Sequence, residues 1–285
     1  MCYGVYSFVI HEYVNLYLNF EIEPLATLYV VATPIGNLKD ITLRALDTLA
    51  KVDIIASEDT RVALKLTSAH GITTPLISYH QHNVEQRDPE LLSTLQQGKD
   101  IALITDAGTP LISDPGHTIV SLCRQHNIEI IPIPGACAAV TALSANDFNI
   151  TRYFFEGFLP AKHSARIQRV RVLCDYPQAL IFYEAKHRIQ AMLEDLRAVC
   201  GDDRRVMIAR ELTKMHEQIV SGPLLEVIEQ FSDNTIPSKG EFVVVLEGAL
   251  HDAQTDQAIE KMRLLFEKIA PTMSHKDAVK LAQEI

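Results

Sequence analysis

The chain has 285 residues, 47% hydrophobic and 22% charged, a composition typical of folded globular proteins and not of disordered or collagen-like chains. This length predicts one large or two medium domains, and the absence of any run of about 18 uncharged apolar residues argues against a membrane span. The net charge of −10 argues against a bulk basic surface for nucleic acid, and five cysteines scattered without a C-x-x-C pair predict neither disulfides nor a zinc site, which fits a reducing cytoplasm.

Residues 1–26 differ in composition from the rest of the chain. They contain six aromatic residues and no Lys or Arg. A secretory signal needs a basic start and a continuous apolar stretch, and His11 and Glu12 interrupt the apolar residues here. We interpret the segment as a leader of uncertain role, with a partner-binding or edge-covering segment as the alternative.

From residue 28 onward, short apolar runs alternate with stretches of helical periodicity. The pattern predicts strands at 28–32, 52–56, 100–105 and 128–133 and helices at 41–50, 117–127 and 136–145. In the first helix, Leu43, Leu46 and Leu49 are expected to face inward. This alternation predicts a mostly parallel sheet with helices on both faces, an α/β domain over residues 27–148.

Residues 147–152 mark the expected boundary to a second α/β domain, over residues 149–250. The periodicity there predicts helices at 164–174, 187–200 and 223–231 and strands at 179–183, 206–211, 217–221 and 241–246, with antiparallel pairs. The polar stretch 251–257 then links to helices at 258–269 and 276–285. We interpret residues 251–285 as a linker and an incomplete helical module.

Three loops at the carboxyl ends of predicted strands are candidate ligand sites, because ligands of such sheets bind there. The loop at 33–37 has one Gly and matches neither the dinucleotide fingerprint nor a phosphate-binding loop. The loop at 106–116 contains two Asp, two Gly and two Pro, which suit ribose hydroxyls or an ammonium group; an ordinary Asp-capped turn is an equal alternative. The loop at 134–139 opens a helix of small residues, which permits close approach of a ligand.

Polar clusters at the ends of predicted strands could supply chemistry. They are Ser57–Arg61, Ser78–Asn83, Tyr183–Arg188, Arg210–Lys214 and Lys239–Phe242. An interdomain network of salt bridges is the alternative for most of them. His80 and His82 would share a face if their segment were extended, but no further ligand has a recognisable spacing, so solvated or substrate-facing histidines are favoured over a metal pair.

The segment 162–171 has four cationic residues and no carboxylate. Arg166 and Arg169 are three residues apart and would share one face of a helix. Residues 151–250 as a whole are nearly neutral, with 13 Lys and Arg against 14 Asp and Glu. An anionic partner would therefore meet this part of the chain, and a solvated helix face is the alternative.

Eight short motifs stand in the order found in the tetrapyrrole methylase superfamily, and they resemble in particular its branch that acts on ribosomal RNA. They are Thr33–Leu38, Glu58–Arg61, Thr105–Pro110, Asp114–Gly116, Glu156–Pro160, Phe182–Glu184, Arg210–Lys214 and Lys239–Phe242. The resemblance covers residues 28–248. It implies a tetrapyrrole-methylase-like fold of two α/β domains with S-adenosylmethionine in the cleft between them, and a homodimer. It also implies methylation of the ribose 2′-hydroxyl of a cytidine in the decoding region of small-subunit (16S) rRNA, as naked rRNA or in the assembled small subunit.

The resemblance and the chemistry of methyl transfer together nominate site residues. By the resemblance, the cofactor pocket is lined by Pro34, Asp106, Ala107, Gly108, Ile112, Ala136, Tyr183 and Leu212. Because transfer to a hydroxyl is an in-line displacement in which a proton must leave, a base and balancing cations are needed. The catalytic candidates, among which the sequence does not choose, are Glu58, Asp59, Arg61, Glu184, Arg210 and Glu211. The candidate RNA contacts are Lys162, Arg166, Arg169, Arg188 and Lys214, and no metal is expected.

Two other functions fit the same sequence. One is methylation of a tetrapyrrole or another small molecule, since fold does not fix substrate. Such enzymes usually begin with a G-x-G-P-G-D loop, where this chain has Thr33–Asn37. The other is a non-catalytic ribosome-associated RNA-binding protein, which binding of S-adenosylmethionine would distinguish from both enzymes.

Overall fold

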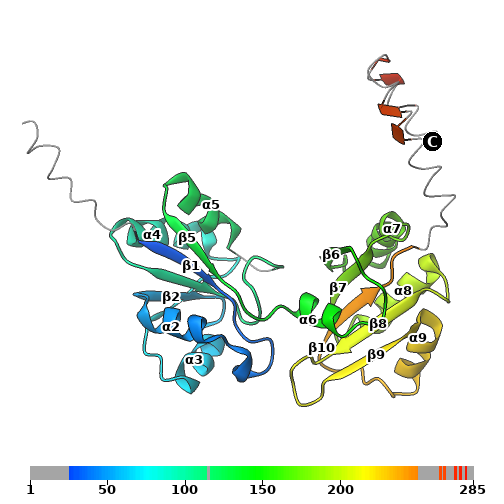
Figure 1. Cartoon of the computed structure of the whole chain (residues 1–285), viewed down its shortest axis with the longest axis horizontal. Helices are drawn as coiled ribbons and strands as arrows, with labels where there is room; N and C mark the ends of the chain where they lie inside the picture. Colours follow the sequence, from blue (N-terminus) through cyan, green and yellow to red (C-terminus); the bar gives the residue numbers. More distant parts are fainter. Residues whose placement is uncertain are drawn as a thin grey trace, which may run out of the picture. The chain divides into compact units, whose positions relative to one another are not determined.

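The computed structural model describes residues 26–113, 116–249, 263–264, 266–267, 273–274, 276–277 and 280. The chain forms two compact units (Figure 1). Unit 1 comprises the described parts of Met1–Ala145 together with Ala209–Ile219, and unit 2 those of Asn146–Ile208 and Val220–Ile285. The segment 209–219, which the sequence interpretation placed in the second domain, is thus grouped with the first.

Unit 1 contains a five-stranded sheet with the order β3-β2-β4-β1-β5. All of its neighbouring strands are parallel. The strands are β1 (Thr27–Val31), β2 (Ile54–Ser57), β3 (Leu76–Ser78), β4 (Ile101–Ile104) and β5 (Glu129–Ile133). The chain passes from β1 toward the β3 edge and from β4 toward the β5 edge, so the strand order reverses between β1 and β4.

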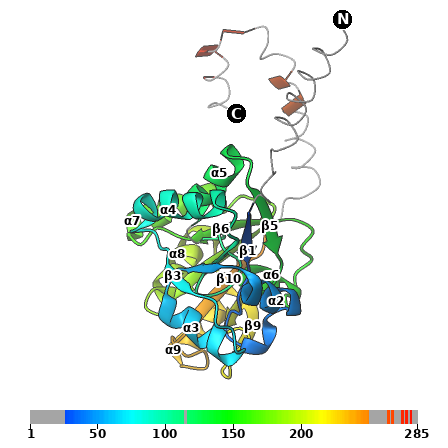
Figure 2. The same ribbon diagram turned by 90° about the vertical axis from the view of Figure 1, so that its left-hand side faces the viewer.

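Helices cover both faces of this sheet, as the alternating pattern predicted. They are α2 (Leu43–Lys51), α3 (Thr60–Ala69), α4 (Val84–Gln96), α5 (His117–Gln125) and α6 (Ala138–Ser144), with a 3-10 turn η1 at Leu38–Asp40. Helices α2 and α3 lie on one face and α4 and α5 on the other (Figure 2). In β4, Ile101 and Leu103 pack with α4 and α5, whereas Ala102 and Ile104 pack with α2 and α3.

Helix α2 begins where its sequence provides a cap. The Thr42 hydroxyl accepts a hydrogen bond from the Ala45 amide at 3.1 Å, which satisfies one free donor of the first turn. Ala45 and Leu49, four residues apart, are buried on the sheet, and Leu46 is half-buried beside them. The prediction that Leu43 faces inward is wrong: it is 81% exposed. At about 100° per residue, Leu43 is turned roughly 200° away from Ala45.

Unit 2 is built around a second five-stranded sheet with the order β6-β7-β10-β8-β9. Its strands are β6 (Tyr153–Phe158), β7 (Ala179–Ala185), β8 (Arg205–Arg210), β9 (Gln218–Pro223) and β10 (Glu241–Leu246). Strand β7 pairs in parallel with β6 and antiparallel with β10, which confirms the expected antiparallel pairing. Helices α7 (His163–Leu173), α8 (Ile189–Cys200) and α9 (Leu224–Ser232) pack on one face in a single hydrophobic cluster with Leu180, Phe182 and Val244.

Several expectations fall on residues that the structure does not describe. The leader at 1–26 is described only at residue 26, and the helices expected at 258–269 and 276–285 lie largely outside the described residues. Where the structure does describe the chain, every helix is too short or too polar to span a membrane.

Candidate functional site

The three loops nominated as ligand sites meet in unit 1. Thr33 and Gly108 exchange two backbone hydrogen bonds, at 2.9 and 3.0 Å, which join the loop after β1 to the loop after β4. The Thr109 hydroxyl donates to the Ala136 carbonyl at 3.2 Å, which adds the loop after β5. This junction lies where the strand order reverses between β1 and β4, the position at which open α/β sheets bind ligands.

Glycines allow the backbones to approach closely at this junction. Gly108 has a φ of +87°, a conformation that L side chains rarely adopt, and a Cβ there would lie 3.4 Å from Ile35 Cγ2. A Cβ on Gly135 would lie 2.9 Å from the Ala32 Cβ, closer than packed carbons tolerate. Gly135 therefore lets the loop after β5 lie close to Ala32, and Gly108 supplies a backbone conformation that glycine adopts readily.

The connection between β8 and β9, residues 211–217, contacts the loop after β1. A Cβ on Gly36 would lie 2.5 Å from Lys214 Cγ and 2.8 Å from Thr213 Oγ1, so only glycine fits without displacing that segment. Glu211 and Thr213 have φ values of +51° and +67°. Left-handed backbone at residues other than glycine costs on the order of 1–3 kcal/mol, and it tends to occur at functional sites.

Four polar residues follow the carboxyl ends of adjacent strands, and we call them the polar edge: Glu58, His80, Thr105 and Asp106. The register pairs Ser57 of β2 with Ser78 of β3 and with Ile104 of β4, so the residues that follow are neighbours. The Tyr79 amide donates to the Ser57 carbonyl at 2.8 Å, and the Asp59 amide donates to Asp106 Oδ1 at 3.0 Å.

The carboxylates beside the polar edge differ in basicity. Burial raises the pKa of Glu58, and the charge of Asp106 raises it further. Burial also raises the pKa of Asp106. In contrast, the hydrogen bonds from Arg61, 2.6 Å from Asp59 Oδ2, lower the pKa of Asp59 to about 2. Glu58 is therefore the better proton acceptor, whereas Asp59 stays ionised and caps α3 by accepting from the Arg61 amide.

Two polar atoms of the polar edge are buried without a hydrogen-bond partner: His80 Nδ1 and Thr105 Oγ1. Such atoms carry a desolvation cost until a ligand or a moving side chain pairs with them. His80 and His82 do not form the extended pair once considered for a metal, because residues 80–83 form a turn in which the His80 amide donates to Asn83 Oδ1 at 2.8 Å. Among the described residues, no group of three or more His, Cys, Asp or Glu side chains is arranged to hold a metal ion.

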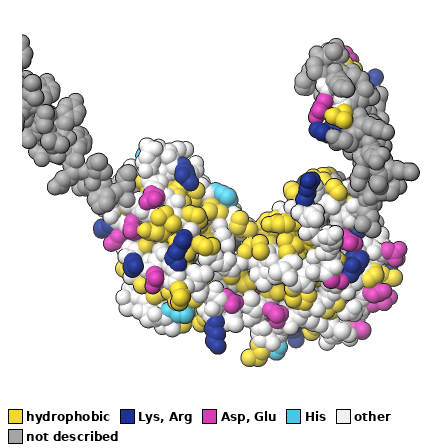
Figure 3. Space-filling model, in the orientation of Figure 1, with side chains coloured by type: hydrophobic (Ala, Val, Ile, Leu, Met, Phe, Trp, Pro, Cys, Tyr) yellow, Lys and Arg dark blue, Asp and Glu magenta, His cyan; other side chains and the backbone are white. Residues whose placement is uncertain are grey.

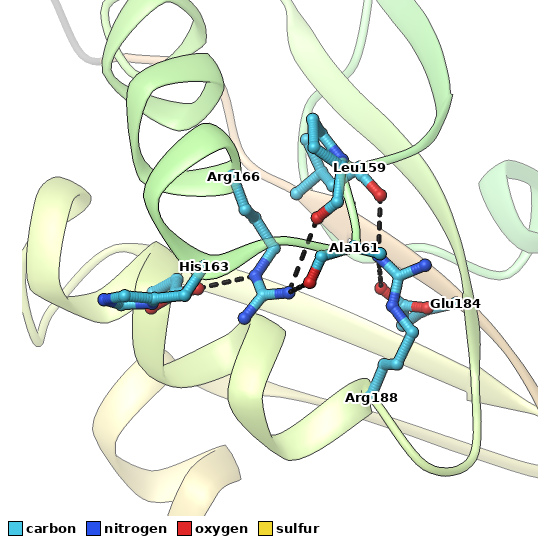
Figure 4. Close-up of polar contacts among 8 residues, drawn as sticks. Leu159, Ala161, His163, Arg166, Glu184 and Arg188 are labelled. Carbon is cyan, nitrogen blue, oxygen red and sulfur yellow. Dashed lines mark hydrogen bonds and ion pairs between the residues drawn. The ribbon is translucent and has the colours of Figure 1, made fainter.

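The charged candidates of unit 2 support a turn between β6 and α7. Arg188 Nη2 lies 3.3 Å from Glu184 Oε2 and donates to the Leu159 carbonyl at 2.6 Å (Figure 4). Arg166 donates from Nε to Asp195 Oδ2 at 2.5 Å and from Nη1 to the Ala161 carbonyl at 3.1 Å. The two arginines thus hold residues 159–161 from opposite sides, and the Glu184 side chain is fully buried.

These contacts contradict the expected RNA role of Arg166. Its side chain is 5% exposed and paired with Asp195, so its charge is not presented to a phosphate. Arg169 turns instead to Glu156, with two hydrogen bonds of 2.6 Å, so the two arginines do not form one exposed face. Lys162 at the start of α7 is exposed. On the face drawn in Figure 3, cationic side chains are scattered among carboxylates and form no continuous basic patch.

The remaining candidates are divided between the units. Tyr183 of β7 lies in unit 2, where its ring meets Phe155 and Phe158 edge-to-face at centroid distances of 5.0 and 5.8 Å. All the other cofactor candidates lie in unit 1, as do Arg210 and Glu211. Lys214 Nζ pairs with Glu211 Oε1 at 2.9 Å. The pairs Asp59–Arg61, Glu184–Arg188 and Glu211–Lys214 are each local in sequence.

Comparison with known proteins establishes the family. The model described as Tetrapyrrole (Corrin/Porphyrin) Methylases matches residues 27–228. The chain belongs to the tetrapyrrole methylase family. Within this family it groups with proteins named ribosomal RNA small subunit methyltransferase I: that of Haemophilus influenzae is 45% identical over 258 residues, covering 90% of this chain and 91% of the relative. The protein of the same name from Synechocystis is 49% identical over 236 residues, covering 83% of this chain and 84% of the relative.

Solved structures show the same tetrapyrrole methylase fold. The cobalamin biosynthetic enzyme cobalt precorrin-4 methyltransferase, CbiF, superposes with a TM-score of 0.57 at 15% identity, over 78% of this chain and 94% of that one. The methyltransferase CobJ superposes with a TM-score of 0.59 at 18% identity, over 79% and 95%. The predicted fold class, an α/β fold of the tetrapyrrole methylase type, is therefore confirmed.

The sequence interpretation gave no role in the site to His80. The segment Ser78–Asn83 stood out as polar, but none of the eight motifs that carry the resemblance included it. Its position was the available signal: a strand at 76–78, once assigned to the parallel sheet, places His80 at the same sheet edge as Glu58 and Asp106.

Proposed function

We propose that the chain transfers a methyl group from S-adenosylmethionine to small-subunit (16S) ribosomal RNA, at the ribose 2′-hydroxyl of a cytidine in the decoding region. The names of its relatives support the RNA substrate. The observation that carries the proposal is the junction of Thr33 and Gly108, which joins two loops with family motifs where the strand order reverses; the loop after β5 joins them through Thr109. The ribose position follows from the resemblance to the RNA-methylating branch.

The residues at this junction fit S-adenosylmethionine. Gly108 has no side chain to keep a ligand from its backbone, and Gly135 lets the loop after β5 lie against Ala32. The Asp106 carboxylate can accept from an ammonium or a ribose hydroxyl. In this proposal the cofactor is held by Pro34, Asp106, Ala107, Gly108, Ile112, Ala136 and Leu212 of unit 1, with Tyr183 of unit 2. When bound, the cofactor supplies an electrophilic methyl group.

The chain's own residues would align the acceptor and assist loss of its proton. Glu58 is the carboxylate best suited to favour that loss, directly or through a neighbour, because its pKa is raised while that of Asp59 is lowered. Asp59 and Arg61 form a fixed ion pair at the start of α3. Arg210, which is buried and donates to the His216 carbonyl at 3.0 Å, and Glu211 position the 209–219 segment. Glu184 supports the turn at 159–161.

Contacts with RNA and the formation of a homodimer are also part of the proposal. Lys162, Arg169 and Lys214 are the cations that an RNA phosphate could reach, the last two by exchanging their carboxylate partners. Arg188 would contribute through the turn it holds. We propose a homodimer acting in the cytoplasm, on naked rRNA or on the assembled small subunit.

One labelling experiment tests the proposed function. The chain would be incubated with methyl-labelled S-adenosylmethionine and, in parallel, small subunits, naked rRNA and a tetrapyrrole. Incorporation into the rRNA of either RNA substrate, and none into the tetrapyrrole, is the expected result. Label in the tetrapyrrole alone would identify a small-molecule methyltransferase, and binding of the cofactor without transfer to any acceptor would indicate a non-catalytic protein.

A further inference from the structure

His80 occupies a position at the polar edge that suits proton transfer. We propose that His80 accepts the proton of the substrate hydroxyl at Nε2, while the carboxylate of Glu58 stabilises the imidazolium that forms. The inference rests on the proposed methyl transfer to a hydroxyl group and names the proton acceptor for it. None of the eight motifs quoted above includes His80.

The backbone fixes where His80 lies. Strand β3 is hydrogen-bonded to β2, with Ser78 beside Ser57, so His80 and Glu58 follow adjacent strand ends. The His80 amide donates to Asn83 Oδ1 at 2.8 Å, and Asn83 Nδ2 donates back to the Ser78 carbonyl at 3.1 Å. The turn that carries the imidazole is thus held by two side-chain bonds and is suited to a residue that must be positioned before the reaction.

The two ring nitrogens of His80 have different surroundings. Nδ1 is completely buried and has no hydrogen-bond partner, whereas Nε2 is not among the buried unpartnered atoms of the described residues. In the neutral ring one nitrogen carries the proton and the other accepts. A proton on the buried Nδ1 leaves the lone pair of Nε2 for a substrate hydroxyl, and the negative charge of Glu58 then favours the doubly protonated ring.

Other charged groups surround Glu58, which we propose stabilises the imidazolium while His80 accepts the proton. Burial, Asp106 and Asp59 raise the pKa of Glu58, and His80 opposes them, so the interaction between imidazole and carboxylate is mutually stabilising when both are charged. Arg61 is engaged with Asp59 at 2.6 Å. The Tyr79 hydroxyl donates to Asp88 at 2.8 Å, away from this pair. His82 meets His80 edge-to-face, with ring centroids 6.0 Å apart.

Thr105 provides an independent sign that a polar ligand group belongs here. It follows β4, the other neighbour of β2, and its side chain is 4% exposed with Oγ1 unpartnered. A buried hydroxyl without a partner is costly, and a hydroxyl or amino group of a ligand placed at this edge would satisfy it. Glu58 follows β2, and the residues that carry the unpartnered atoms, His80 and Thr105, follow its two neighbours β3 and β4.

The proposed step moves one proton and one methyl group. The substrate O–H proton passes to His80 Nε2, and the oxygen forms a bond to the methyl carbon of the sulfonium donor. The bond between that carbon and sulfur breaks, and its electron pair stays on sulfur as a neutral thioether. The imidazolium returns its proton to water. Asp59 is unsuited to this role, because its pKa is lowered to about 2.

The test compares His80→Gln with His82→Gln, a matched change two residues away on an exposed ring. Single-turnover methylation of small subunits would be followed at saturating cofactor between about pH 5 and pH 8. We expect His80→Gln to slow transfer by about 10²- to 10⁴-fold and to remove the rise of the rate with pH. We expect His82→Gln to keep the wild-type profile and both variants to keep the wild-type cofactor affinity.

A wild-type rate in His80→Gln would overturn the proposal. If the wild-type chain methylates no hydroxyl acceptor, the proposed function itself is wrong. If the wild type is active and His80→Gln is equally active, only the role of His80 is wrong.

Discussion

Arg166 Nε lies 2.5 Å from Asp195 Oδ2, and the two side chains are only 5% and 7% exposed. The other carboxylate oxygen lies 2.9 Å from His163 Nδ1. This buried pair ties α7 to α8, and the guanidinium also holds the Ala161 carbonyl. A cation that the sequence presents as part of a basic helix is therefore an internal support of unit 2.

The first prediction concerns this pair. Arg166→Met should lower the free energy of unfolding by about 3–5 kcal/mol, because Asp195 would remain buried without its counter-charge. Denaturant unfolding measures the change. Arg171→Met, on the exposed side of the same helix, should change stability little, and adding Asp195→Leu to Arg166→Met should restore most of the loss. A loss below about 1 kcal/mol for Arg166→Met would place the pair among weak surface ion pairs instead.

The second prediction concerns the cofactor loop. Gly108→Val should abolish measurable binding of S-adenosylmethionine, because the added side chain would occupy the space proposed for the ligand and strain a backbone with a φ of +87°. Gly71→Val is the matched control, since Gly71 has a φ of +67° with nothing within 4 Å of its Cβ. Both should lose about 1 kcal/mol or more of stability from backbone strain. Calorimetry that shows normal binding by folded Gly108→Val would move the pocket elsewhere.

The third prediction concerns Asp106. Asp106→Ala should weaken cofactor binding by about 1–3 kcal/mol, the usual effect of losing one hydrogen bond to a charged group. Asp106→Asn keeps one acceptor and should lose less. Equal affinity in all three proteins would exclude a contact between this carboxylate and the cofactor.

The fourth prediction concerns pH and stability. The pKa of Glu58 is raised in the folded state above its ordinary value of 4.5, so the fold favours the protonated form. The stabilisation is present below the unfolded pKa and is lost as pH rises through the folded pKa. Glu58→Gln should therefore be more stable than the wild type at pH 7, and the difference should vanish at about pH 4.

Asp59→Asn is the control, with an expected effect of opposite sign. The pKa of Asp59 is lowered to about 2, so the ionised side chain stabilises the fold at any pH above its ordinary pKa of 3.8. The variant should therefore be less stable than the wild type at pH 7. Urea unfolding at both pH values measures both variants. If Glu58→Gln lowered the stability at pH 7, the inference that the fold disfavours the ionised Glu58 carboxylate would be wrong.

The fifth prediction concerns RNA contact at α7. Arg166 is buried against Asp195, whereas Lys162 is exposed. Lys162→Ala should weaken RNA binding for all sequences and reduce the slope of log affinity against log salt by about 1. Lys51→Ala, an exposed change at the end of α2, should leave the slope unchanged. Filter binding over a range of salt concentrations gives both slopes. An unaltered slope for Lys162→Ala would support the alternative of a solvated helix face.

The elements predicted from the sequence were those with strong apolar patterns. Strand β4 and strand β10 are continuous buried runs and were assigned within a residue or two. Strand β3 has three half-buried residues, too few for a periodic signal. Strand β6 exposes Tyr153, Phe154 and Phe158, so its aromatic residues do not alternate with polar ones. Helix α4 contains Pro89, which argues locally against a helix.

The sequence predicted those parts of the candidate site that lie within a single loop. It did not predict contacts between segments that are far apart in the sequence. The loops at 33–37 and 106–116 were identified by position, and the structure joins them through Thr33 and Gly108. The contact of Gly36 with Thr213 and Lys214 depends on where the β8–β9 connection lies, which no local pattern encodes. The burial of Arg166 likewise depends on Asp195, 29 residues away.

Mapping the methylated atom in the RNA product distinguishes methylation of the ribose from methylation of a base. Alkaline cleavage of RNA requires a free 2′-hydroxyl, so small-subunit rRNA treated with the chain and S-adenosylmethionine would be cleaved and separated as a ladder. We predict one protected linkage, at a cytidine of the decoding region, that appears only when both protein and cofactor are present and is lost with Gly108→Val. A ladder without any protected linkage, with the methyl label recovered on a nucleobase, would contradict ribose methylation.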